Sequence, residues 1–300
     1  MPAAEMKEGY TGDIQAFPLK FDSLDQEINF HCTLQMLNFG SAYQDLLDDR
    51  SVFETIQYGM LGLMLSGRKM NAQMLSSMSL SDVGQTFGVE VKREAKIKPD
   101  TPIYTEEDTE VAGFAKLILK ACEDTGRRLR ELDCEDFAQF FRKFLDVDKP
   151  TASAFVFVLQ KQLPVFCDGY TTGDTEIYVL SKAKLLAAEL HRRFSFRAPL
   201  FDFQDMDRLG SPMGNAIPAL LRSVGVLSYD PELSRRVDER RSVTGDLEME
   251  LRCVAVHACH QIAEAVEVNG AELYLHLRNV AEKAEFASAP RHLTPNTLFF

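Results

Sequence analysis

Apolar residues recur at helical spacing along most of this 300-residue chain, and this pattern constrains the fold more than any other feature. One run begins at Phe137 and continues with apolar residues at i+3, i+4, i+7 and i+8, ending at Leu145. Such a stripe is typical of an amphipathic helix that packs one face on a core. The chain is therefore expected to be built mainly from packed helices.

Four further segments show helical signals. We expect a helix over about 106 to 122, where acidic residues come first and lysines come last, as the helix dipole favours. Asp246 would cap a long helix that stops at Asn269-Gly270, and another would follow over about 271 to 285. The spacing also predicts a helix over Lys182 to Phe194.

Strand signals are sparse. The clearest is Glu176 to Leu180, a β-prone run after a turn-rich segment, whereas Glu90 to Asp108 has the composition of a long surface connection. The sequence predicts a mostly α fold with a few short strands. We expect one domain over 1–300, with an N-terminal helical subregion at about 1–105 and a core at about 106–300.

Charge and cysteine usage restrict the class of partner. The 33 basic and 45 acidic residues give a net charge of -12, so direct nucleic-acid binding is not expected and a small molecule is the expected partner. The six scattered cysteines form no disulfide framework or zinc motif, and no apolar run is long enough for a membrane span. We expect a cytoplasmic protein with no membrane association; its oligomeric state is not determined.

Common catalytic signatures are absent, including phosphate loops, GxGxxG, GxSxG and HExxH. His257, His260 and Glu264 could present three ligands on one helix face, but a half-buried polar face is the favoured interpretation, because no further set of ligands converges on them in the sequence. We therefore predict no metal and no cofactor. Residues 201–208 alternate phenylalanine with aspartate; they could line a pocket, or form a solvated loop anchored by its phenylalanines.

Seven short motifs, in order along nearly the whole chain, resemble those of the queuosine-salvage family, also described as queuosine 5′-phosphate N-glycosylase/hydrolases. They are 37–43 (LNFGSAY), 51–56 (SVFETI), 163–168 (LPVFCD), 177–186 (IYVLSKAKLL), 209–227, 248–252 (EMELR) and 296–300 (NTLFF). The resemblance implies a helical fold related to helix-hairpin-helix DNA glycosylases. It also implies a 7-deazaguanine nucleotide as ligand and free queuine base as product.

Breaking an N-ribosidic bond creates cationic character on the sugar. A carboxylate stabilises that charge and orients water, while a donor assists the departing base. In the family motifs we assign the carboxylate to the aspartate of "A-D-Y-R" and a supporting cation to the lysine of "Y-K-R-A". Here those positions are Gly214 and Ser181, and neither residue can supply the charge.

Other residues would have to replace the missing pair. Asp205, before the altered loop, and Asp168, in a retained motif, are the catalytic candidates, with a turn-forming role as the alternative for Asp168. Lys182 could supply a cation, or be a solvated helix residue. Asn215 could bind a base edge or shape the turn before Pro218. The predicted ligand-binding residues are Asn38, Phe39, Ser41, Phe166, Ser181, Lys182, Phe203 and Asn215.

Two functions from different classes follow. The first is an N-glycosidase that hydrolyses queuosine 5′-phosphate, or a related 7-deazaguanine nucleoside, to release queuine for salvage into tRNA modification. The alternative is a catalytically degenerate paralogue that only binds a nucleobase or nucleotide, or acts as an interaction protein. Binding a nucleotide, with or without hydrolysis, requires a cavity, and we expect the segments around Phe39, Phe166, Ser181 and Asn215 to converge on one.

Overall fold

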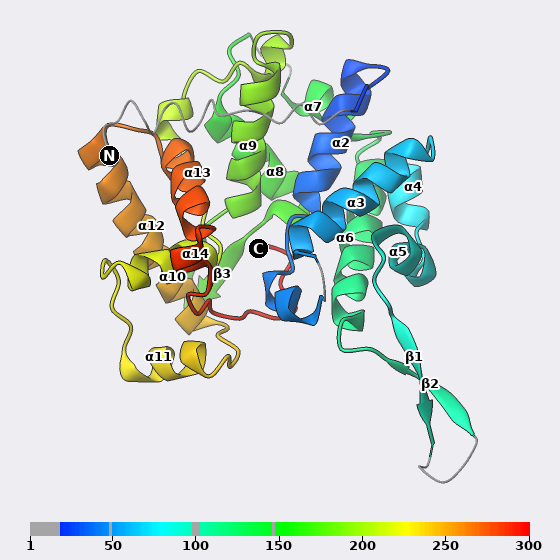
Figure 1. Ribbon diagram of the computed structural model, residues 1–300. Coiled ribbons are helices and arrows are strands. Elements are labelled where there is room, and N and C mark those ends of the chain that lie inside the picture. The colour runs from blue at the N-terminus through cyan, green and yellow to red at the C-terminus, as the bar shows by residue number, and fades with distance from the viewer. Residues whose placement is uncertain (1–18, 48–49, 98–102, 146–147) are drawn as a thin grey trace.

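The computed structural model describes residues 19–47, 50–97, 103–145 and 148–300, and it is mostly helical with two small two-stranded sheets (Figure 1). The predicted fold class is thereby confirmed. The α-helices are α2 (Leu24–Met36), α3 (Val52–Leu65), α4 (Ala72–Ser77), α5 (Leu80–Phe87), α6 (Ala112–Glu131), α7 (Phe137–Phe144), α8 (Ala152–Gln162), α9 (Ser181–Phe194), α10 (Ala216–Ser223), α11 (Pro231–Asp238), α12 (Asp246–Val266), α13 (Gly270–Ala281) and α14 (Ala284–Ala287). The short 3₁₀ helices are η1 (Ser41–Leu46), η2 (Pro164–Phe166), η3 (Pro199–Phe201) and η4 (Met206–Arg208).

The first hairpin corrects two predictions. Strands β1 (Lys92–Lys96) and β2 (Tyr104–Asp108) pair antiparallel within the segment expected to be a surface connection, and the helix expected from about 106 begins only at Ala112. Glu107 pairs with Arg93 at 2.9 Å and Asp108 with Lys92 at 2.6 Å, across the two strands. The acidic residues that suggested a helix start thus complement a basic strand. The hairpin projects from the helical body (Figure 1).

A phenylalanine-rich core lies between α6, α7, α8 and α9. Phe140 and Phe141 on α7 are fully buried, as the helical stripe predicts, and Phe141 packs on Phe155 of α8 with ring centroids 5.0 Å apart. The N-cap residue of α7, Asp136, accepts a hydrogen bond from the backbone of Gln139 at 2.8 Å. This core fixes α9, whose first turn carries Ser181 and Lys182, both buried.

A second apolar cluster joins α10, α12 and α13, with Ile217, Ala255 and Leu273 buried within it. The long helix predicted from Asp246 is present, but Gly245 is its N-cap residue, because its positive φ of 66° turns the chain into the helix. None of the helices in the described ranges is long and apolar enough to cross a lipid bilayer. The relation to helix-hairpin-helix glycosylases and the division near residue 105 stay predictions.

The final residues connect the two sides of the molecule. After α14 the chain crosses from α13 towards the turn between α2 and η1 (Figure 1). There Gly40 donates a backbone hydrogen bond to the carbonyl of Phe300 at 3.0 Å, and the Tyr43 hydroxyl donates to Asn296 Oδ1 at 3.4 Å. The two apolar clusters are thereby bridged around a cavity.

Candidate functional site

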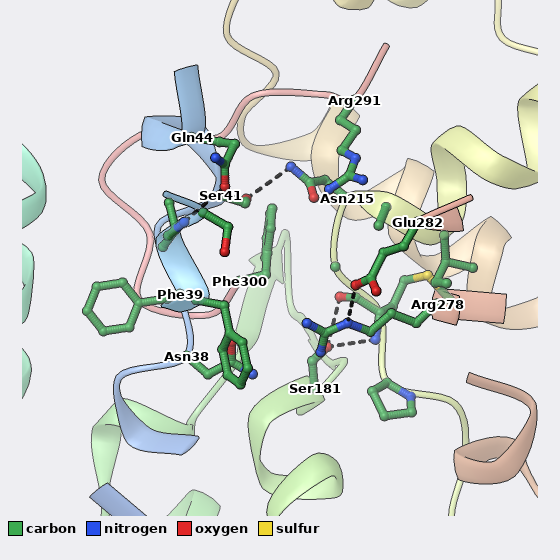
Figure 2. Close-up of a pocket in the computed structure, with 18 of the residues that line it drawn as sticks. Asn38, Phe39, Ser41, Gln44, Ser181, Asn215, Arg278, Glu282, Arg291 and Phe300 are labelled. Carbon is green, nitrogen blue, oxygen red and sulfur yellow. Dashed lines mark hydrogen bonds and ion pairs between the residues drawn. The ribbon is translucent and has the colours of Figure 1, made fainter. Parts of the chain in front are cut away.

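A cavity of about 710 Å³ lies between the α2–η1 turn, the first turn of α9, the loop before α10 and the C-terminal part of α13 (Figure 2). This volume is typical of small-molecule sites. Six of the predicted ligand-binding residues line it. They are Asn38, Phe39, Ser41, Ser181, Lys182 and Asn215. Segments up to 177 residues apart in sequence therefore meet at one surface, although the contacts of these residues with a ligand stay a prediction.

The other two predicted residues lie in the core. Phe166 is fully buried behind Lys182, with its ring centroid 5.7 Å from the ammonium nitrogen. Phe203 packs on Phe155, with ring centroids 5.2 Å apart, and is 3% exposed. Both were expected at the cavity wall; neither lines it, because the aromatic core draws these large apolar side chains inward. In the 201–208 segment the structure contains a loop anchored by its buried phenylalanines, the second of the two interpretations.

Lys182 is a buried cation at the base of the cavity. Its Nζ donates to the carbonyl of Met36 at 2.7 Å and lies 5.0 Å from the ring centroid of Phe39. The residue is only 1% exposed, and burial lowers the pKa of its ammonium to about 7. The solvated-helix alternative for Lys182 is therefore wrong.

Asp168 supports the cavity from behind. Its two carboxylate oxygens bind Arg252 through a fork of hydrogen bonds at 2.9 and 2.6 Å, and one of them also accepts from the backbone of Ser181 at 3.2 Å. The Asp168 side chain is fully buried, and it does not line the cavity. Arg252 also donates to the carbonyl of Met213 at 2.8 Å and lies 4.5 Å from the ring centroid of Phe300. This network fixes the cavity floor.

The loop before α10 is held by Ser181 and Asn215. The hydroxyl of Ser181 donates to the Met213 carbonyl at 2.8 Å and accepts from the Met213 amide at 3.0 Å. Asn215 Nδ2 donates to Ser41 Oγ at 3.0 Å, joining this loop to η1. Between them, a Cβ on Gly214 would lie 3.3 Å from the Cβ of Phe300. The position to which the resemblance assigns a catalytic aspartate thus faces an aromatic side chain.

Asp205 lies outside the residues that line the cavity. Its carboxylate accepts hydrogen bonds from the backbone of Ala152 at 2.5 Å and from the Ser153 hydroxyl at 2.5 Å, at the N-terminus of α8. Burial alone would raise the pKa of Asp205, but these hydrogen bonds hold it below its ordinary value. These contacts hold the carboxylate at the N-terminus of α8, away from the residues that line the cavity.

The opposite wall carries residues that the motifs do not predict. Arg278 of α13 and the adjoining Glu282 pair at 3.2 Å across from Phe39 and Phe300 (Figure 2). Arg291 has no hydrogen bond or ion pair within the described part of the chain, and burial together with the nearby Arg278 lowers its pKa. A sequence signal existed for part of this set, since Tyr274, Arg278 and Glu282 recur every fourth residue over a predicted helix.

Three of the described lining residues carry carboxylates, and each has a partner. Glu54 accepts from the Ser51 amide at 2.7 Å in the capping box of α3. Asp45 pairs with Arg240, and Glu282 pairs with Arg278. The cavity therefore offers aromatic faces, polar groups and cations, but no unpaired acid among these residues.

On α12, His260 pairs with Glu264 at 3.3 Å on the exposed face, away from the cavity lining.

Comparison with known proteins agrees with the motifs. The family model described as "Queuosine salvage protein" matches residues 22–281. A curated relative from Sphaerobacter thermophilus, named queuosine 5′-phosphate N-glycosylase/hydrolase, is 23% identical over 188 residues, which are 59% of this chain and 58% of the relative. The aligned part therefore spans less than two thirds of that protein. Because the family model covers most of the chain, the chain belongs to the queuosine salvage protein family.

Proposed function

We propose that the cavity binds queuosine 5′-phosphate, or a closely related 7-deazaguanine nucleoside 5′-phosphate, and that the protein hydrolyses its N-glycosidic bond. The observation that carries this proposal is that an aromatic wall and a basic wall face each other across one cavity. Phe300 offers a flat apolar face for a base, with the largely buried Phe39 (3% exposed) beside it, whereas Arg278 and Arg291 offer guanidinium groups suited to a phosphate. Membership of the queuosine salvage family, together with the name of the Sphaerobacter relative, a queuosine 5′-phosphate N-glycosylase/hydrolase, supports cleavage to the free base as the reaction.

One specific observation favours a second candidate, binding without hydrolysis. Gly214 faces Phe300, so the carboxylate expected from the family is missing, and the described carboxylates of the lining are all paired. An aromatic cavity without an available acid would bind the nucleotide and leave it intact. Asp168 and Asp205 stay predictions as catalytic residues, and their asparagine variants belong in the same assay.

The test is to incubate the protein with queuosine 5′-phosphate, quantify free queuine by mass spectrometry and measure the binding constant by calorimetry. Arg291→Met should weaken binding about 10- to 100-fold, the value of a charge-assisted contact. Arg142→Met is the control, because Arg142 pairs with Asp25 outside the cavity. Tight binding with no base released would establish the second candidate, and no binding would reject both.

A further inference from the structure

The paired acid beside Arg278 suggests how the cavity could regain a working carboxylate. We infer that Glu282 is the catalytic carboxylate of this chain, and that the substrate's own phosphate activates it by drawing Arg278 away. This inference rests on the proposed function. It assigns the reaction to the residue that ends α13 rather than to a residue of the loop before α10.

Position is the first argument. Glu282 is the C-cap residue of α13, one turn after Arg278, and both side chains lie on the wall opposite Phe39 and Phe300 (Figure 2). A base stacked on the aromatic wall would place its sugar towards that carboxylate. The other lining acids are less suitable, because Glu54 caps α3 and Asp45 pairs with Arg240. Glu282 is also 60% exposed, so it can turn about its side-chain bonds.

Charge is the second argument. Arg278 Nε lies 3.2 Å from Glu282 Oε1 and neutralises this carboxylate. Arg291, the second cation of this wall, has no ion pair within the described residues. A phosphate carries more charge than one carboxylate and matches the guanidinium fork, so it would compete successfully for Arg278 while also contacting Arg291. Glu282 would then face the sugar freed of its ion pair with Arg278.

The resulting step is a hydrolysis. The carboxylate of Glu282 stabilises the cationic sugar and accepts one proton from a water molecule. The water oxygen bonds to C1′, and the bond from C1′ to the base nitrogen breaks with its electron pair going to the base. The base takes up one proton from solvent and Glu282 releases its proton to solvent, so the products are free base and ribose 5-phosphate. Nucleosides without the phosphate would leave Arg278 on Glu282 and react slowly.

Glu282→Gln tests both parts of the inference. Base release from queuosine 5′-phosphate at saturating concentration should fall about 10²- to 10⁴-fold, as on loss of an acid–base group. Inorganic phosphate should bind the variant about two- to fivefold more tightly, because a surface ion pair no longer competes for Arg278. Glu232→Gln is the matched control. Glu232 pairs with Arg236 in the same i,i+4 arrangement on α11, outside the cavity.

The outcomes separate the two proposals. Release at the parental rate by Glu282→Gln, unchanged phosphate affinity, or an equal loss of release in Glu232→Gln would each overturn the role of Glu282 and leave the hydrolase proposal standing. If the parent protein binds queuosine 5′-phosphate but releases no base, the hydrolase proposal fails and the role of Glu282 fails with it. Slow release with tighter phosphate binding supports the inference.

Discussion

Two arginine–carboxylate pairs serve the same cavity in opposite surroundings. Arg252 and Asp168 have side-chain exposures of 0% and 1%, whereas Arg278 and Glu282 have 32% and 60%. The buried pair is held by several further hydrogen bonds to Ser181 and Met213, and neither charge can leave without being stranded in the interior. The exposed pair has water as an alternative partner, so it can exchange. Burial thus distinguishes the pair that builds the floor from the pair that can respond to a ligand.

This difference also explains why the retained motif residue Asp168 is a weaker catalytic candidate than its position in the sequence suggests. Its oxygens are already occupied by Arg252 and by the Ser181 amide. A carboxylate in such a network orients its neighbours rather than approaching a substrate. Within the described residues Glu282 makes one ion pair, with Arg278 at the cavity wall, which leaves its charge available when that partner moves.

The largest effect should come from breaking the buried pair. Arg252→Met removes one partner and leaves Asp168 uncompensated, so the free energy of unfolding should fall by about 3–5 kcal/mol. Urea titration of the parent protein and the variant measures this loss in the free energy of unfolding. Arg222→Met is the comparison, because Arg222 makes the same forked contact with Asp238 at 2.7 and 3.0 Å near the surface and should cost about 0–1 kcal/mol. Equal losses would remove the distinction based on burial.

The buried ammonium of Lys182 should make stability depend on pH. Burial lowers its pKa from 10.5 to about 7, so between these values the folded protein binds fewer protons than the unfolded chain. Stability should therefore rise with pH across that window, by at most about 1.4 kcal/mol per pH unit, and this contribution should be level below it. Lys182→Met should flatten the slope in urea titrations, while Lys161→Met, on the exposed face of α8, should not. An unchanged slope in Lys182→Met would place the titration elsewhere.

How far the sequence predicts this molecule depends on whether a signal is local. The α7 stripe and the helix over α9 were predictable, because apolar spacing directly reports a buried face. The charges at Glu106 to Asp108 gave a wrong helix start. Acidic residues favour the first turn of a helix and also complement a basic strand, and only the pairing with Lys92 and Arg93 distinguishes the two.

For the site, the motifs located the α2–η1 turn, the start of α9 and the loop before α10. They could not reveal that Arg252 forms an ion pair with Asp168, 84 residues away in sequence, or that the Asp205 carboxylate accepts hydrogen bonds at the N-terminus of α8. Partners of this kind depend on the packing of distant helices. Arg278 lay within a predicted helix. A polar stripe on a helix is ordinarily a solvated face, so the position of Arg278 in the sequence gave no reason to predict it as a binding residue.

The smallest change in stability should come from the exposed pair, and it is the sharpest test of the comparison. Arg278→Met removes a half-exposed cation that pairs with Glu282 and lies 5.5 Å from the ring centroid of Phe53. Because water replaces the lost partner and the methionine stem keeps most of the packing, the free energy of unfolding should change by about 0–1 kcal/mol. Arg127→Met on α6, which removes an exposed pair with Asp124, should change it equally little. Calorimetry with inorganic phosphate should nevertheless separate the two variants, since only Arg278 lines the cavity. A loss of stability as large as that of Arg252→Met would mean that the exposed pair is structural too, and that Arg278 is not free to exchange.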